Sequence, residues 1–415
     1  MDTGSIGFIL FSAAFVFLMT PALAFFYGGL ARRKNVLNTM MACLYVCGIG
    51  IIMWILFGYS LSFGNDHGGV IGGFDFLGFQ NVSMIDSTKE LSVPDGCFAL
   101  FQMMFAIITP ALFTGSVVGR MKFKSLILFT TLWSLVVYYP LAHMVWGGGF
   151  LAAIGSVDFA GGNVVHISSG VTGLTLALLL GNRREYHRAS YAPHNVPYVI
   201  LGAALLWFGW FGFNAGSALA ADGLAVHAFA TTAISSASAL ISWMIIDTVM
   251  TGKPTVVGCC TGLVVGLVAI TPGCGFVPIW ASIIIGLLVS PICYFGVILL
   301  KKKLKIDDAL DAFGCHGIGG IWGGLATGLF AMKQLPGGVK STARWDGLVF
   351  GDYRLFLAQV ESIVITIVIA VAGTLICYGI VRLFGKVRVS EQEEKLGMDL
   401  SQHGENAYPT FNGMD

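Results

Sequence analysis

Two histidines lie in segments that repeat one pattern at distant places in the chain. Asp158 precedes His166 by the same number of residues that separates Asp308 from His316. Each histidine is followed by glycines four and seven positions later, which are Gly170 and Gly173 in the first segment and Gly320 and Gly323 in the second. Glycines at this spacing lie on roughly one face of a helix and let another helix approach closely. The pattern therefore predicts that two histidine-bearing helices meet.

The chemistry that two such imidazoles favour is proton transfer. A neutral imidazole has one hydrogen-bond donor and one acceptor, so two in contact can share a proton and align a row of small polar molecules. The alternative is that each ring only hydrogen-bonds a neighbouring helix. Because the histidines recur at matched positions inside apolar segments, where an ionisable group is costly, we expect His166 and His316 to form a pore and proton relay.

The composition indicates which solvent surrounds these helices. Hydrophobic residues make up 56% of the 415 positions and charged residues only 11%, which is too few charges to cover a water-soluble surface of this size. We therefore expect an all-α, polytopic membrane protein in a lipid bilayer. The net charge of +1 gives no indication of nucleic-acid binding or of a polybasic lipid anchor.

Apolar stretches long enough to cross a bilayer recur up to about residue 385, and they predict eleven transmembrane helices in residues 1–385 and a tail in residues 386–415. The expected spans are 6–31, 36–62, 96–118, 125–145, 162–181, 196–216, 226–249, 255–271, 279–302, 314–332 and 356–384. The first is too long for a signal-peptide core, so we expect it to be retained. Helices 1–5 and 6–10 then form an inverted repeat with a pseudo-two-fold axis, because each half has an odd number of spans.

The basic residues predict the orientation, since cytoplasmic loops collect Lys and Arg. They cluster in alternate loops at Arg32-Arg33-Lys34, Arg120 with Lys122 and Lys124, Arg183-Arg184 with Arg188, Lys253, and Lys301-Lys302-Lys303 with Lys305. The acidic loop 63–94 suits the outside. We therefore expect the N-terminus outside and the C-terminus in the cytoplasm of a cell-membrane protein, although the basic loop 333–355 disagrees with this assignment.

Six segments carry a resemblance to a known family. They are FFYGGLARRKNVL at 25–37, FQMMFAIITPAL at 101–112, HMVWGGG at 143–149, DFAGGNVVH at 158–166, GWFGFNAGSA at 209–218 and DAFGCHGIGG at 311–320. In sequence and order they are similar to segments of the ammonium transporter family. The resemblance covers nearly the whole chain and implies nitrogen uptake by transport of ammonium, with methylammonium as a second substrate, without enzymatic catalysis and without a cofactor or metal.

The resemblance implies an external recruitment site formed by Phe105, Trp146 and Ser217. An aromatic face attracts a cation and a hydroxyl accepts one of its hydrogen bonds, so this chemistry suits ammonium. From periodicity alone, Trp146 would instead belong to the interfacial aromatic belt. Below this site, the family pattern places two stacked rings, Phe105 and Phe213, as a pore gate, and Trp210 lies near enough in sequence to line the same wall.

The resemblance also implies a route in which ammonium releases its proton. An ammonium ion entering a narrow apolar pore would lose its hydration shell, so ammonia would cross and the proton would travel separately by way of the two histidines. Asp158 is expected to organise the start of its helix by accepting hydrogen bonds, with a part in the proton path as an alternative. Asp308 and Asp311 are expected to be its structural counterparts.

The tail resembles the regulatory tail of the family. The matching positions are Gly397, Asp399, His403, Gly404, Glu405 and Tyr408, which suggest docking beneath the pore, whereas composition alone would allow disorder. Family members are homotrimers, and many are blocked by a PII-type signal protein, so we expect both for this chain. One departure is Gly119, where relatives usually carry glutamate. The resemblance therefore supports transport more strongly than it supports regulation by the tail.

The remaining histidines and cysteines carry structural expectations. We expect His67, His187, His194 and His403 at the surface and His143 and His227 in local bonds near helix ends, and we expect no disulfide between Cys97 and Cys274. Three other functions compete with ammonium transport. They are a Rhesus-type conductor of ammonia or carbon dioxide, an ammonium sensor that signals through the tail, and a membrane cytochrome with haem between the two histidines.

Overall fold

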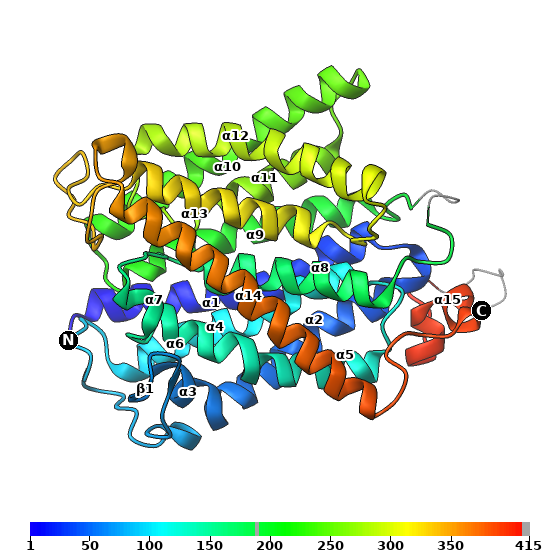
Figure 1. Ribbon diagram of the computed structural model, residues 1–415, viewed down its shortest axis with the longest axis horizontal. Helices are drawn as coiled ribbons and strands as arrows, with labels where there is room; N and C mark the ends of the chain where they lie inside the picture. Colours follow the sequence, from blue (N-terminus) through cyan, green and yellow to red (C-terminus); the bar gives the residue numbers. More distant parts are fainter. Residues whose placement is uncertain (187–190, 409–415) are drawn as a thin grey trace.

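The computed structural model describes residues 1–186 and 191–408, and most of these residues are helical (Figure 1). The long helical segments are α1 (Thr3–Leu30), α2 to α3 (Val36–Met53, a π-helical turn at Trp54–Gly58, and Tyr59–Phe63), α4 (Asp95–Thr114), α5 to α6 (Phe123–Trp133, a π-helical turn at Ser134–Tyr138, and Tyr139–Trp146), η6 with α8 (Gly162–Ile167 and Ser168–Leu180), α9 (Val196–Ala215), α10 (Gly223–Thr251), α11 (Val256–Ile270), α12 (Ile279–Ile298, followed by a π-helical turn at Leu299–Lys303), η9 with α13 (Phe313–Gly317 and Ile318–Phe330) and α14 (Arg354–Leu383). The short elements are α7 (Phe150–Ala153), α15 (Glu391–Leu396), η11 (Asp399–His403) and a hairpin of β1 (Asp66–His67) and β2 (Ile71–Gly72).

The eleven predicted helices are confirmed within the described part of the chain, with ends that differ by a few residues. Nine of the segments in that part are at least 18 residues long and apolar enough to cross a membrane. The other two are the shorter helix α11 and the segment formed by η9 and α13. Both belong to the second half of the chain. The segment formed by η9 and α13 contains His316, and α11 lies close to the two histidines in space.

The outer surface of the bundle is apolar, as a lipid-facing surface must be. Large hydrophobic side chains are exposed along the helices, among them Phe11 at 68%, Val226 at 71%, Val249 at 76% and Val368 at 60%. The interior instead contains many small hydroxyl side chains, such as Thr231, Thr232 and Ser235, all fully buried. Buried hydroxyls can donate hydrogen bonds to helix carbonyls, so they can lie between closely spaced helices without leaving a polar group unpaired. This distribution places the protein in a bilayer.

The two halves of the fold run in opposite directions. The first helices of the halves, α1 and α9, pack along each other, and α8 contacts the turn η9 that begins the histidine segment of the second half. The two chain ends described lie at opposite ends of the bundle (Figure 1), which we call the N-terminal end and the tail end. Because η6 begins near the N-terminal end and η9 near the tail end, the predicted inverted repeat is confirmed.

The glycines that follow the histidines lie where the repeats touch. A Cβ atom on Gly170 would overlap the backbone of Gly317, and one on Gly320 would lie 3.0 Å from Ile167 Cγ1 and 3.2 Å from His166 Cβ. Backbone atoms cannot move aside as a flexible side chain can. The glycines therefore permit the close approach of the two histidine helices that their spacing predicts.

The substitution Gly170→Ala is expected to lower the free energy of unfolding by roughly 1–3 kcal/mol, because the added methyl group forces apart two backbones. Gly379→Ala is a matched control, since no atom lies within 4 Å of the Cβ position of Gly379. Thermal unfolding of both variants in the same detergent measures the difference. Equal midpoints for the two variants would contradict the close packing.

Candidate functional site

A cavity of about 370 Å³ opens at the N-terminal end of the bundle and contains the three residues of the predicted recruitment site. Phe105 comes from α4, Trp146 from the last turn of α6, and Ser217 from the 3-10 turn after α9. The same cavity is lined by Phe98, Gln102, Val145, Ala152, Ser156, Val157, Asp158, Phe159, Leu219, Phe276 and Thr342. Residues far apart in the sequence thus form one vestibule.

Hydrogen bonds hold two of the vestibule residues in place. The indole Nε1 of Trp146 donates to the backbone carbonyl of Asp158 at 2.8 Å, and Ser217 Oγ donates to the carbonyl of Phe213 at 2.9 Å. Because the Ser217 hydroxyl gives its proton to the backbone, its lone pairs remain available to accept an N–H from a ligand. The half-buried indole lines the vestibule, and an aromatic face of this kind can attract a cation.

A continuous column of rings leads from the vestibule into the interior. The ring of Trp146 lies 5.8 Å from that of Phe105, and Phe105 lies 4.3 Å from Phe213 at an interplanar angle of 34°. Phe213 in turn lies 6.1 Å from His166, and His166 lies 5.3 Å from His316. Both phenylalanines are almost fully buried, so together they separate the vestibule from the histidines.

The two histidines face a narrow, mostly apolar space. Their rings are nearly parallel, at an interplanar angle of 21°, and their exposed fractions are 1% for His166 and 3% for His316. The space beside them measures about 10 Å³. Its other walls are Met19, Leu23, Phe26, Ile108, Leu112, Val165, Leu206, Trp210, Phe213 and Val264. This is close to the least volume that can hold one water molecule.

The ring nitrogens are the unusual feature of this space. Both nitrogens of His166 and Nδ1 of His316 are buried without a hydrogen-bond partner among the described residues. Buried polar groups are nearly always paired, so three unpaired nitrogens at one place indicate a role other than helix packing. Among the described residues, His166 makes no side-chain hydrogen bond to a neighbouring helix, so the structure does not support that alternative.

Two aspartates hold the turns that carry the histidines. The Asp158 carboxylate accepts from the backbone N–H groups of Gly161, Gly162 and Asn163 at 2.8, 2.6 and 2.7 Å, at the start of η6. The expected anchoring contacts of Asp158 are therefore present, and its part in a proton path stays a prediction.

Asp308 makes the equivalent contacts at the start of η9. Its carboxylate accepts from the N–H groups of Ala312 and Phe313 at 3.2 and 2.8 Å, and from Ser116 Oγ at 2.6 Å. Asp311 differs, because it adopts a φ of +59° and pairs with Lys301 at 2.6 Å. Only Asp308 matches Asp158 in its contacts.

Sequence reasoning missed a buried ion cluster at the tail end. The Arg183 guanidinium makes two hydrogen bonds to the Asp307 carboxylate, at 2.8 and 2.6 Å, and Arg120 approaches the same carboxylate at 3.5 Å. Burial alone would raise the pKa of Asp307, but the two guanidinium groups outweigh it and hold that pKa below its usual range. Arg120 also donates to the carbonyl of Gly181 at 2.7 Å, so the cluster joins three loops.

Asp307→Asn is expected to destabilise the protein by roughly 3–5 kcal/mol, because two buried guanidinium groups lose their counter-charge. The lowered pKa of Asp307 also sets a pH dependence. The stabilisation is complete above the unfolded-state pKa and is lost as pH falls through the lower folded-state pKa. Thermal unfolding of wild type and variant between pH 7 and pH 3 measures both effects. If the difference between their unfolding midpoints stayed constant down to pH 3, the pH dependence assigned to Asp307 would be wrong.

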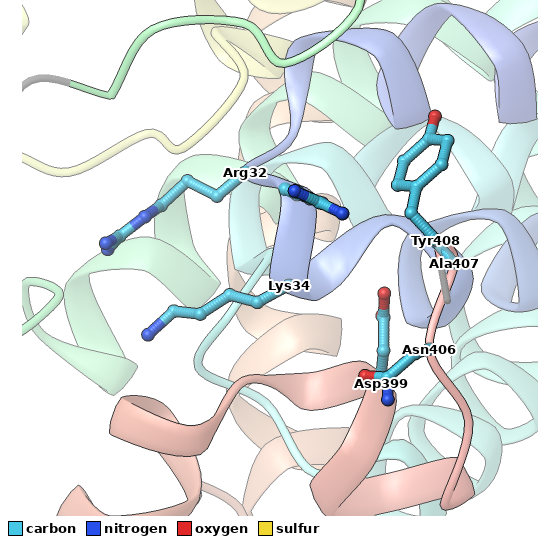
Figure 2. A pocket seen from close by; sticks show the side chains of 7 residues that line it. Arg32, Lys34, Asp399, Asn406, Ala407 and Tyr408 are labelled. Carbon is cyan, nitrogen blue, oxygen red and sulfur yellow. The ribbon is translucent and has the colours of Figure 1, made fainter. Parts of the chain in front are cut away.

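The tail is docked against the loops at the tail end. Asp399 Oδ1 accepts from the backbone N–H of Asn38 at 2.9 Å near the start of α2, and Lys34 Nζ donates to the carbonyls of Glu394 and Lys395 at 2.9 and 2.7 Å. Figure 2 shows Asp399 and Tyr408 beside the loop that bears Arg32 and Lys34, around a cavity of about 460 Å³. The expected docking of the tail is confirmed for residues up to Tyr408.

Two histidines expected at the surface are only partly exposed, and both contact residues far away in the sequence. His194 is not a free surface residue, since it contacts the Ala31 carbonyl and the Tyr408 hydroxyl, each at 3.1 Å. His403 contacts Asn38 Oδ1 at 3.1 Å and packs against the ring of Phe123. Composition does not reveal contacts between a tail and distant loops.

Gly119 lies next to the residue that holds the tail. It has a φ of +76°, and a Cβ atom there would lie 2.8 Å from Asn35 Nδ2. Asn35 Oδ1 accepts from the backbone N–H of Met398 at 2.9 Å. Glycine at position 119 therefore leaves room for the Asn35 side chain that binds the tail, and docking persists despite the departure from the family pattern.

The other structural expectations have mixed outcomes. His143 contacts the Ser62 carbonyl and Asp66, and His227 contacts the Val277 carbonyl, so both make the local bonds expected. His67 is exposed as expected, and His187 lies outside the described residues. Cys97 and Cys274 are both free and buried in the structure, and the expected absence of a disulfide between them stays a prediction.

Comparison with known proteins identifies the family. The model of the Ammonium Transporter Family matches residues 7–408. The chain belongs to this family. An ammonium transporter of Bacillus subtilis is 47% identical over 98% of this chain and 99% of its own length, and ammonium transporter Amt1 of Archaeoglobus fulgidus is 44% identical over 98% of this chain and 100% of its own length. The function of the chain is ammonium transport.

Solved structures of this family have the same fold. The crystal structure of Mep2 from Saccharomyces cerevisiae superposes with a TM-score of 0.88 at 37% identity, covering 99% of this chain and 93% of that chain. A structure described as a sensor Amt protein superposes with a TM-score of 0.88 at 26% identity, covering 96% of this chain and 98% of that chain. Ammonium transporters therefore share the helix arrangement that forms the ring column.

Proposed function

We propose that this ammonium transporter recruits the cation in the vestibule, removes its proton at the phenylalanine gate, and passes ammonia along the histidine column. The proton travels separately by a polar path that includes His166 and His316. The observation that supports this proposal is the unbroken series of rings from Trp146 through Phe105 and Phe213 to the two histidines. The only bond that breaks is one N–H bond of ammonium, and its proton passes to a ring nitrogen of His166, which has no hydrogen-bond partner among the described residues.

The desolvation cost supports deprotonation rather than passage of the intact ion. A space of about 10 Å³ walled by apolar side chains cannot hold a hydrated cation. Removing the hydration shell of an ion costs several kcal/mol or more, whereas ammonia is neutral. Potassium is similar in size to ammonium but has no proton to release, so the route excludes it.

Two rival functions make different predictions about charge. A Rhesus-type neutral conductor would share the histidine column but move no charge. A sensor would bind ammonium in the vestibule with little flux and signal through the docked tail. The structural similarity to the sensor Amt protein is the observation that supports this second candidate function. We favour net ammonium transport because the curated relatives that match almost the whole chain are described as ammonium transporters.

The orientation and the partners follow from charge and from the family. Basic residues of several loops gather at the tail end, among them Arg32, Lys34, Arg183 and Lys301, so this end faces the cytoplasm and the N-terminus lies outside. The protein then resides in the cell membrane as a homotrimer, with a PII-type signal protein binding beside the docked tail. Methylammonium, which carries one apolar group, is a second substrate.

Trp146→Leu tests the recruitment step. Loss of the cation–aromatic attraction is expected to raise the half-saturating methylammonium concentration by about 3- to 30-fold, because such contacts contribute roughly 0.5–2 kcal/mol. The maximal rate should change less, since the gate and the histidines remain. Uptake of labelled methylammonium into proteoliposomes measures both quantities.

Trp280→Leu serves as the control for this experiment, because Trp280 is 45% exposed, packs on Phe330 and is not one of the described residues that line the vestibule. Its half-saturating concentration should match wild type. If Trp146→Leu also matched wild type, the vestibule would not be the recruitment site.

A further inference from the structure

The orientation of His166 depends on ring contacts rather than on hydrogen bonds. Its imidazole stacks on Trp210 at 5.4 Å and 27°, on Phe213 at 6.1 Å and 19°, and on His316 at 5.3 Å and 21°. Neither ring nitrogen has a partner among the described residues. The plane of the imidazole is therefore set by the planes of its neighbours.

Trp210 is the neighbour with a polar anchor. Its indole Nε1 donates to Thr271 Oγ1 at 2.9 Å, and both side chains are almost fully buried. Thr271 directly follows α11, and its hydroxyl donates to the Leu267 carbonyl at 2.8 Å and lies 3.3 Å from Asn214 Oδ1. The acceptor for the indole is thus itself held in a fixed position.

The anchor extends across three helices. Asn214 Nδ2 donates to Thr232 Oγ1 at 2.9 Å, and Thr232 Oγ1 donates to the Ala228 carbonyl at 2.6 Å. The chain of bonds therefore connects α9, the end of α11 and α10. Asn214 and Thr232 are fully buried, so water does not compete for these bonds.

We propose that Thr271 is a positioning residue for transport, because it fixes the indole plane of Trp210 and thereby the imidazole plane of His166. This inference rests on the proposed function, in which the histidine column conducts ammonia and relays the proton. A buried indole N–H without a hydrogen-bond acceptor is destabilising. Without Thr271 Oγ1, the indole ring of Trp210 therefore rotates or binds a water molecule. Either change removes the stacking contact between Trp210 and His166.

The experiment compares Thr271→Val with Thr271→Ser in proteoliposomes. Valine keeps the shape and removes the acceptor, whereas serine keeps the hydroxyl. We expect Thr271→Val to lower the ratio of ammonium to potassium current by about tenfold, as loss of one buried hydrogen bond can do, and we expect Thr271→Ser to retain the wild-type ratio. Thr261→Val is a matched control, because among the described residues the Thr261 hydroxyl bonds only the Val257 carbonyl of its own helix.

Two further variants separate positioning from a general packing defect. Trp210→Phe breaks the same bond from the other side, so the double variant with Thr271→Val should be no worse than either single variant. In a His166→Ala background, Thr271→Val should have no added effect on selectivity. Additive losses in either combination would overturn the positioning role, and Trp210→Phe supplies the test if Thr271→Val does not fold.

The outcome also distinguishes this inference from the function on which it rests. If His166→Ala itself leaves the selectivity unchanged, the proposed function fails. If His166→Ala relaxes the selectivity while Thr271→Val and Trp210→Phe both match wild type, the proposed function stands and only the positioning role of Thr271 is wrong.

Discussion

His166→Ala is expected to lower the selectivity for ammonium over potassium by at least about tenfold, because each 1.4 kcal/mol of lost discrimination is a factor of ten. The substitution replaces a ring between Phe213 and His316 with a methyl group, and the enlarged space keeps a polar wall in His316. Water enters a cavity that offers both room and polar partners. A hydrated path would then carry potassium as well as ammonium.

The control for this variant is His67→Ala, since His67 is an exposed histidine in the β1–β2 hairpin at the N-terminal end. Currents in response to ammonium and potassium gradients, recorded from the same preparation, give the selectivity directly. An unchanged rate and an unchanged selectivity in His166→Ala would show that the histidine column is not the pathway.

Asp158→Ala is expected to have the largest effect on folding of the site. It removes the acceptor of three short backbone hydrogen bonds at the start of η6, and bonds to a charged group contribute roughly 1.5–3 kcal/mol each, so a loss of about 5 kcal/mol or more is expected. The turn that carries His166 and the carbonyl that anchors Trp146 would both move. Transport should therefore fall to background, and thermal unfolding should begin at a clearly lower temperature.

Asp158→Asn should be milder, because its amide oxygen still accepts hydrogen bonds while its NH₂ group does not. Asp86→Ala in the exposed N-terminal-end loop is a suitable control, and Asp308→Ala should reproduce the loss at the equivalent turn η9. Wild-type stability in both Asp158→Ala and Asp308→Ala would contradict the anchoring role that the paired pattern implies.

The sequence predicted those features that depend on local pattern or repetition. Hydropathy identified the helices, and the duplicated spacing of Asp158 and Asp308 with their histidines predicted two antiparallel segments in contact. The proposed recruitment and gate residues were predictable only through resemblance, since 31 phenylalanines leave no way to single out Phe105 and Phe213 by composition. In the structure these residues lie in one column because α4, α6 and α9 converge at the N-terminal end.

The features that sequence reasoning missed depend on contacts between distant loops. Arg120, Arg183 and Asp307 belong to three different loops, and each alone resembles an ordinary basic or acidic loop residue. His194 and His403 likewise contact partners more than 150 residues away, such as Tyr408 and Asn38. Thr271 and Asn214 are small polar residues of a kind common in membrane helices, so only their position beside Trp210 distinguishes them.

Charge movement across proteoliposomes tests the central claim most directly. Purified protein would be reconstituted, and the current would be recorded after an ammonium pulse and after a matched potassium pulse. The proposed separation of ammonia from its proton predicts a current with ammonium and a potassium current near the background of protein-free liposomes. Currents from both ions would contradict the deprotonation filter, and the absence of an ammonium current would instead indicate neutral ammonia conduction or sensing.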